Sequence, residues 1–324
     1  MTPREALPGD LWSILATPFD ADGALDHRSM RRQVDFVRAA GASGVVALGV
    51  FGEATSLSLE EHRAVVRTVA EAADGLPVVV GVGARSTAVA VEQAVNVVHA
   101  LRDRAGPRAL MVMIPSGEAM ATVAHLTAVH EASGLPVVLQ DYPASSGVRI
   151  SPSGLAEVVR RCPFVCAIKA EAAPTAPAIA ELLAAAGSSD VGAVPVFGGL
   201  GGVGLVDELS VGASGAMTGF SHPEGLRATL DAFNKGGFGA ARQAWARWLP
   251  IAVFEAQAGI SLALRKALLQ RRGVLGQATV RPPAPGLPAA MSDLVDRHAA
   301  SAMELLAPGA AARRTGVPTV EVTP

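Results

Sequence analysis

The sequence has few of the residues that build metal sites, disulfides or amine chemistry. It has two cysteines, too few for a disulfide framework, and no Cys or His cluster has metal-ligand spacing. The scattered histidines are therefore expected to be surface or packing residues. Only three of the 27 basic residues are lysines, at positions 169, 235 and 266, and Tyr142 is the single tyrosine. Since arginine stays protonated and cannot form an imine, amine chemistry has three candidate residues.

Charge and long apolar runs are also scarce. Charged residues make up 17% of the chain and the net charge is −2, which predicts no nucleic-acid partner. No stretch approaches the roughly 20 apolar residues of a membrane span, and residues 1–10 lack the apolar core of a signal peptide. We therefore expect no membrane partner and a cytoplasmic location. Half of the residues are hydrophobic, enough for a large core.

Short apolar runs alternate with longer amphipathic segments over more than 200 residues. Continuous apolarity over five to eight residues is typical of strands buried on both faces of a parallel sheet. The sequence predicts such strands within 11–19, 44–50, 77–83, 109–115, 136–143, 164–171, 194–199 and 212–219. It predicts helices near 28–40, 59–73, 86–104, 118–132, 152–161, 174–186, 202–210 and 223–235. Ser58, with Glu61 three residues on, forms a capping-box pattern, and Ser151-Pro152 marks another helix start.

Eight strands, each followed by a helix, predict an α/β fold of the (β/α)₈ TIM-barrel type. The alternative is a doubly wound open sheet, but the loop after the first strand reads DADGALDH and lacks G-x-G-x-x-G. After residue 236 the pattern is helical, with segments at 238–257, 260–274 and 291–306. We therefore predict a barrel over 1–236, a C-terminal helical extension over 237–306, and a loose tail over 307–324.

Lys169 is the lysine best placed for chemistry, near the end of the predicted sixth strand. Barrel active sites lie at the C-terminal ends of the strands. Burial favours a neutral amine, which can attack a ketone to give an iminium that acts as an electron sink. The alternative is a purely structural ion pair with Glu171 or Glu53. Lys235, in a glycine-rich turn, and Lys266, on a helix, are both expected to be solvated.

Three motifs then resemble a known family. The segments ATPFDADGALD, LGVFGEATSLSLEEH and AIKAEA are similar to signatures of the dihydrodipicolinate synthase and N-acetylneuraminate lyase superfamily. The resemblance runs from about residue 11 to 272. It implies a (β/α)₈ barrel with extra C-terminal helices, an imine on Lys169, a small 2-oxo acid substrate, and no metal or organic cofactor. It also implies a homo-oligomer, a dimer or tetramer.

The chain departs from the family where that family carries two hydroxyl residues between the glycines of its second motif. This chain has Val50 and Phe51 there, whose side chains cannot bind a carboxylate or relay protons. We therefore expect the backbone N–H groups of Phe51, Gly52 and Glu53 to hold the substrate carboxylate.

The fifth-strand motif departs as well. Gln140 stands where the family has its proton-relay tyrosine, and Ser145 where it has an arginine. Tyr142 is two residues beyond Gln140, and strand alternation predicts the same face for both. Tyr142 can then replace the family's tyrosine as the proton relay, or it can serve only as an aromatic residue at the rim of the site. The missing arginine and tyrosine argue against dihydrodipicolinate synthase activity.

The pattern Q-D-x-P-A-S, together with IK-x-E and GA-x-GAMTG, resembles the branch that contains 2-keto-3-deoxy sugar acid dehydratases. It implies a class I lyase, a dehydratase or an aldolase, in which Glu171 or Glu53 serves as base or only as an ion-pair partner. Condensation or cleavage of pyruvate adducts is an alternative, as is 2-oxo acid binding without turnover. The predicted catalytic residues are Lys169, Gln140 and Tyr142. The predicted substrate contacts are Val50, Phe51, Gly52, Glu53, Ser145, Glu171, Gly199, Met217 and Thr218.

Overall fold

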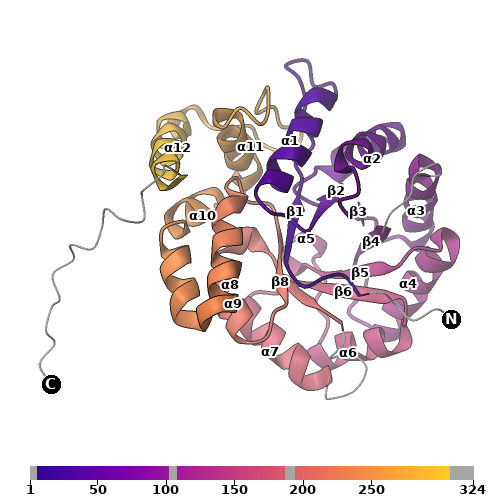
Figure 1. Ribbon diagram of the computed structural model, residues 1–324. Coiled ribbons are helices and arrows are strands. Elements are labelled where there is room, and N and C mark those ends of the chain that lie inside the picture. The colour runs from indigo at the N-terminus through magenta and orange to yellow at the C-terminus, as the bar shows by residue number, and fades with distance from the viewer. Residues whose placement is uncertain (1–5, 102–107, 187–193, 307–324) are drawn as a thin grey trace, which may run out of the picture.

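The chain folds into a closed barrel of eight parallel strands in sequence order, which confirms the predicted fold class (Figure 1). The structure is a computed structural model that describes residues 6–101, 108–186 and 194–306. The predicted tail over 307–324 lies outside the described residues. The strands are β1 (Leu11–Ile14), β2 (Gly44–Ala47), β3 (Val78–Val82), β4 (Arg108–Met113), β5 (Val137–Asp141), β6 (Val165–Ala170), β7 (Val196–Gly198) and β8 (Gly215–Thr218).

Helices surround the barrel, and local sequence signals fix several of their ends. At the start of α2, Ser58 and Glu61 form the predicted capping box, and Ser151 caps α6. The helices between the strands are α1 (His27–Ala39), α2 (Leu59–Ala73), α3 (Thr87–Leu101), α4 (Ala119–Ser133), α5 (Pro143–Ser146), α6 (Pro152–Arg161), α7 (Thr175–Ala186) and α8 (Leu205–Ser210). Short 3₁₀ turns, η1 (Ala54–Ser56) and η3 (Leu200–Gly202), follow β2 and β7.

The C-terminal helices differ from the prediction in one place. Helix α9 (Pro223–Ala246) is kinked at Gly237, where the backbone is non-helical with φ 64°, so the break expected in the glycine-rich segment beside Lys235 is present inside this helix. The segment 238–257 was predicted as one helix, but α9 ends at Ala246 and α10 (Leu249–Glu255) begins anew, with Pro250 in its first turn. The remaining elements are α11 (Ser261–Arg271), η4 (Ala289–Met291) and α12 (Ser292–Leu306). No helix in the described ranges has the length and apolarity that a membrane crossing needs.

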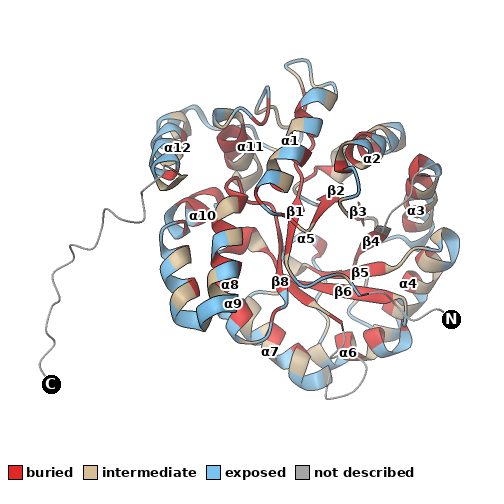
Figure 2. Cartoon of the chain, in the orientation of Figure 1, coloured by how far each residue is buried: buried red, intermediate tan, exposed pale blue. Residues whose placement is uncertain are grey.

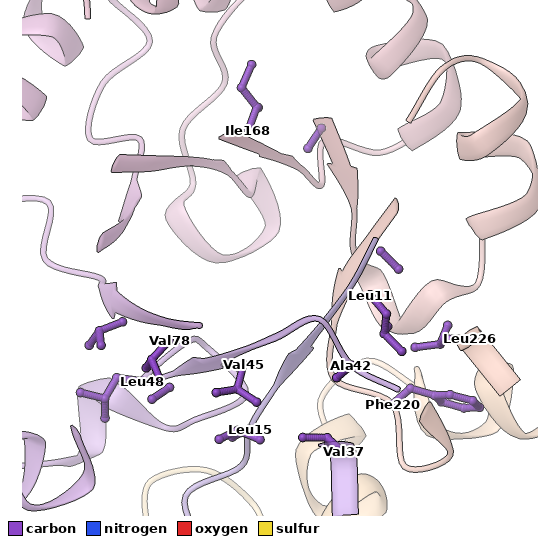
Figure 3. Packing of buried hydrophobic residues seen from close by; sticks show 14 of the residues in the cluster. Leu11, Leu15, Val37, Ala42, Val45, Leu48, Val78, Ile168, Phe220 and Leu226 are labelled. Carbon is purple, nitrogen blue, oxygen red and sulfur yellow. The ribbon is translucent and has the colours of Figure 1, made fainter. Parts of the chain in front are cut away.

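Two apolar layers hold the fold together. Every strand is buried, whereas the helices alternate between buried and exposed faces (Figure 2). One layer fills the barrel interior and includes Trp12, Met111 and Phe197. The other lies between the strands and the helices, where Ile168 and Val45 pack (Figure 3).

Strand β6 uses both sides of the barrel wall. Ile168 and Ala170 belong to the outer apolar layer. Because side chains alternate along a strand, Lys169 points the opposite way, into the barrel. In the ladder Lys169 is directly opposite Gln140 of β5. The register therefore brings these two polar side chains together at the C-terminal ends of neighbouring strands.

Candidate active site

Lys169 and Glu171 form a buried ion pair at the end of β6. Lys169 Nζ lies 3.0 Å from Glu171 Oε2, and the two residues are 6% and 5% exposed. Of the two ion-pair partners considered from the sequence, Lys169 therefore has Glu171 and not Glu53. A buried pair of this kind is costly to desolvate, so its position next to a cavity points to a use beyond packing.

Glu171 is the centre of a hydrogen-bond network. Its Oε2 accepts a bond of 2.9 Å from Gln140 Nε2, and its Oε1 accepts one of 3.2 Å from the amide of Leu200. Leu200 has a φ of 47°, an uncommon conformation for a residue with a side chain. Gly199 packs directly behind the carboxylate, since a Cβ added there would lie 2.2 Å from Glu171 Oε1. The loop after β7 is thus shaped around this carboxylate.

A cavity of about 560 Å³ opens above the ion pair. It gathers seven of the predicted site residues: Val50, Phe51, Glu53, Tyr142, Lys169, Glu171 and Thr218. Thr218 also organises the rim, because its Oγ1 accepts a 2.8 Å bond from the Gly201 amide. The volume falls within the range usual for small-molecule sites.

The other predicted residues do not line this cavity. Gln140 and Ser145 line a neighbouring pocket of about 250 Å³, which shares Val50 with the larger one. Met217 lines neither pocket, because it is fully buried in the apolar interior of the barrel. Its role as a substrate contact stays a prediction, since Met217 packs with the apolar side chains of the barrel interior and not with the residues that line the cavity.

The loop after β2 changes the expected carboxylate site. The amides of Gly52 and Glu53 already donate to Gly49 O at 2.9 Å and Val50 O at 3.1 Å. The Thr17 hydroxyl donates to Gly52 O at 2.6 Å and fixes the loop to the end of β1. Of the three amides expected to bind the carboxylate, only that of Phe51 has no acceptor within the described residues.

Lys266 is not solvated, which corrects the sequence prediction. It is fully buried on α11, where Nζ pairs with Glu53 Oε1 and donates to Thr279 O at 2.7 Å. Its Nζ also lies 4.4 Å from the centre of the Phe19 ring. Burial lowers the pKa of the Lys266 amine, and the Glu53 carboxylate offsets this only in part. The charged neighbours of Lys266 in the sequence had suggested a solvated helix face.

Arg265 is a residue of the site that sequence reasoning missed. It lines the large cavity from α11 and carries a guanidinium 5.5 Å from the centre of the Phe51 ring. Its Nε donates to Glu255 Oε1 at 3.1 Å. No local signal identified it, because helical periodicity does not reveal which neighbour a C-terminal helix will face.

Burial also tunes the acids around Glu171. The pKa of Tyr142 is raised by burial and by the charge of Glu171, while Arg265 acts in the opposite sense. Burial, with a further contribution from Glu171, raises the pKa of Asp141 to about 6. Tyr142 therefore keeps its proton at neutral pH. Among the described residues no group of three or more His, Cys, Asp or Glu side chains is arranged to hold a metal ion.

Comparison with known proteins agrees with this geometry. The Dihydrodipicolinate synthetase family matches residues 8–300. The L-2-keto-3-deoxyarabonate dehydratase of Azospirillum brasilense is 31% identical over 294 residues, covering 88% of this chain and 91% of that protein. The 4-hydroxy-tetrahydrodipicolinate synthase of Corynebacterium diphtheriae is 31% identical over 274 residues, covering 82% and 85%. The crystal structure of dihydrodipicolinate synthase from Rhodopseudomonas palustris superposes with a TM-score of 0.83 at 28% identity, covering 91% of this chain and 99% of that one. The chain therefore belongs to the dihydrodipicolinate synthetase family.

Proposed function

We propose that the protein is a class I lyase that binds a short 2-oxo acid as an imine on Lys169 and removes water across C3 and C4. The observation that carries the proposal is the position of Lys169. Of the three lysines, it alone lines the large cavity, and it does so from the end of a barrel strand. Lys266 is held in a separate buried ion pair, and Lys235 is exposed on α9.

The neighbouring carboxylate supplies the proton transfers that this chemistry needs. Glu171 is 3.0 Å from Lys169 Nζ, close enough to take the ammonium proton and leave a nucleophilic amine. The amine then adds to C2, and the carbonyl oxygen leaves as water to give the iminium. Glu53 is a poorer candidate for the base, because Lys266 and the amide of Arg281 already occupy its carboxylate.

Dehydration then follows from the acidity of C3 in the iminium. A base, for which Glu171 is our candidate, removes a C3 proton, and the electron pair moves into the iminium to give an enamine. The enamine expels the C4 hydroxyl, which leaves as water after gaining a proton. Tyr142 lines the same cavity with its proton in place and is our candidate donor. A final water hydrolyses the iminium and frees Lys169.

The substrate we favour is a 2-keto-3-deoxy sugar acid with a hydroxyl at C4. A relative of 31% identity over most of both chains is an L-2-keto-3-deoxyarabonate dehydratase. The cavity of about 560 Å³ has room for a five-carbon or six-carbon acid. Aldol cleavage of the C3–C4 bond starts from the same imine and differs only in which bond breaks.

Borohydride trapping with pyruvate tests the imine. We expect the intact protein to gain one reduced adduct, which peptide mass analysis assigns to Lys169. Lys169→Met should abolish the adduct, and the exposed-lysine control Lys235→Met should form it like the wild type. A wild-type adduct on another lysine, or none with pyruvate or any longer 2-oxo acid, would contradict the proposal.

Turnover separates the lyase from a protein that only binds 2-oxo acids. A panel of 2-keto-3-deoxy acids should yield a dehydrated product with at least one member and little pyruvate. Pyruvate release in its place would make the protein an aldolase. Trapping of Lys169 without any product across the panel would favour binding without turnover.

A further inference from the structure

We propose that Arg265 binds the C1 carboxylate of the 2-oxo acid whose C2 carbon reacts with Lys169. The inference rests on the imine chemistry proposed above and adds the group that selects acids over neutral carbonyl compounds. Lys169 and Arg265 are the cationic side chains among the described residues that line the large cavity. Lys169 already faces the carboxylate of Glu171.

Arg265 is held so that one edge of its guanidinium remains available. Its Nε donates to Glu255, a residue with no exposed surface, and the side chain of Arg265 is itself only 12% exposed. Glu255 is fixed in turn by Ser221, whose amide and hydroxyl both donate to the carboxylate. Neither Nη of Arg265 has a protein acceptor within the described chain. A planar guanidinium with free N–H donors on its two Nη atoms can donate two parallel hydrogen bonds to the two oxygens of a carboxylate.

The surroundings of Arg265 keep this fork in the cavity. Phe51 packs near the guanidinium on one side. Gly201 leaves room for it on another, because a Cβ added there would lie 2.6 Å from Arg265 Nη2. Gly201 also has a φ of 72°, which favours glycine. Arg265 is therefore positioned by its contacts with Glu255, Phe51 and Gly201, and its Nη groups keep their hydrogen-bond donors available.

The loop after β2 offers the C1 carboxylate of the substrate no charged partner that could replace Arg265. C1 is bonded to C2, so once C2 is attached to Lys169 the carboxylate must lie within the same cavity. Val50 and Phe51 carry no polar side chain, and the amides of Gly52 and Glu53 are engaged. An unpaired buried carboxylate is costly. Arg265, assisted by the free Phe51 amide, offers the charge and the donors that the carboxylate requires.

The test compares a carboxylated probe with one that lacks the carboxylate. Pyruvate and hydroxyacetone are each titrated in borohydride trapping, and the concentration for half-maximal labelling of Lys169 is measured. We expect Arg265→Met to raise this concentration for pyruvate by about 10-fold to 100-fold, and to leave that for hydroxyacetone within about twofold. Arg265→Lys should fall between the wild type and Arg265→Met, since it keeps the charge and loses the fork.

The matched control is Arg271→Met, which removes an arginine from the same helix. Arg271 pairs with Asp296 away from the cavity, so its loss should not alter either titration. Thermal melts verify folding, and Arg265→Lys serves alone if Arg265→Met does not fold. An unchanged pyruvate titration, or an equal loss with both probes, overturns the role of Arg265 while Lys169 labelling stands. If the wild type forms no adduct with pyruvate or with any longer 2-oxo acid, the imine proposal fails and this inference with it.

Discussion

Replacing Lys266 by methionine should severely destabilise the protein. Lys266 has no exposed surface, and its Nζ pairs with Glu53 and donates to Thr279 O at 2.7 Å. Methionine fills a similar volume but leaves the Glu53 carboxylate, 4% exposed, with the amide of Arg281 at 2.9 Å as its remaining hydrogen-bond donor among the described residues. Stranding a buried charge in this way costs about 3–5 kcal/mol. Since domains are stable by only about 5–15 kcal/mol, the loss is a large fraction of the total.

Equilibrium unfolding in urea measures this cost, and a double variant tests its cause. Lys266→Met combined with Glu53→Gln removes both charges, so the double variant should regain at least half of the stability that the single variant loses. Lys235→Met changes an exposed lysine on α9 and should stay within about 0.5 kcal/mol of the wild type.

Two results would contradict this role of the Lys266–Glu53 pair. A loss below about 1 kcal/mol for Lys266→Met would mean that water or a neighbouring group compensates Glu53. A double variant no more stable than the single one would mean that the packing of the lysine stem, and not the charge pair, sets the cost.

Two other substitutions probe buried carboxylates packed against the end of β7. Gly199→Ala places a Cβ 2.2 Å from Glu171 Oε1 and should slow imine trapping by about 100-fold. The control is Gly83→Ala, where an added Cβ meets nothing within 4 Å, and it should leave the trapping rate unchanged. Equal rates for the two variants would mean that imine formation does not require Glu171 to stay in place. Glu208→Gln removes a buried carboxyl whose pKa burial raises to about 7 from 4.5. Because the folded wild type binds this proton more tightly than the unfolded chain, the wild type loses stability as the pH rises through the interval between these two values. The advantage of the variant in urea unfolding should therefore grow by roughly 2 kcal/mol from about pH 5.5 to about pH 8.5, and a difference that does not vary with pH would contradict the shift.

The barrel could be predicted because its determinants are local and repeated. Each strand is a short run buried on both faces, and several of the following helices begin at a recognisable signal, as at Ser58 and Ser151. The glycines after Lys235 marked a real break, since Gly237 is non-helical inside α9. The prediction failed within 238–257, where one helix was expected but α9 ends at Ala246 and α10 begins at Leu249, with Pro250 in its first turn.

The candidate site was predictable only along single strands. The alternation of β6 was enough to turn Lys169 inward and to place Glu171 beside it. The burial of Lys266 could not be predicted in this way, because a lysine within an amphipathic helix is ordinarily solvated. Its partner Glu53 is more than 200 residues earlier in the chain, and periodicity carries no information about such a contact.

Local patterns were enough to predict the βα repeat, the lysine at the end of the sixth strand and the similarity to the family. These follow from the alternation of buried and exposed positions and from short motifs, which act within a few residues. Three features became evident from the folded chain alone: which amides after β2 remain free, that Met217 is buried in the barrel interior, and that Arg265 reaches the cavity. Closing the barrel and packing α11 beside Phe51 bring together groups that no local pattern relates.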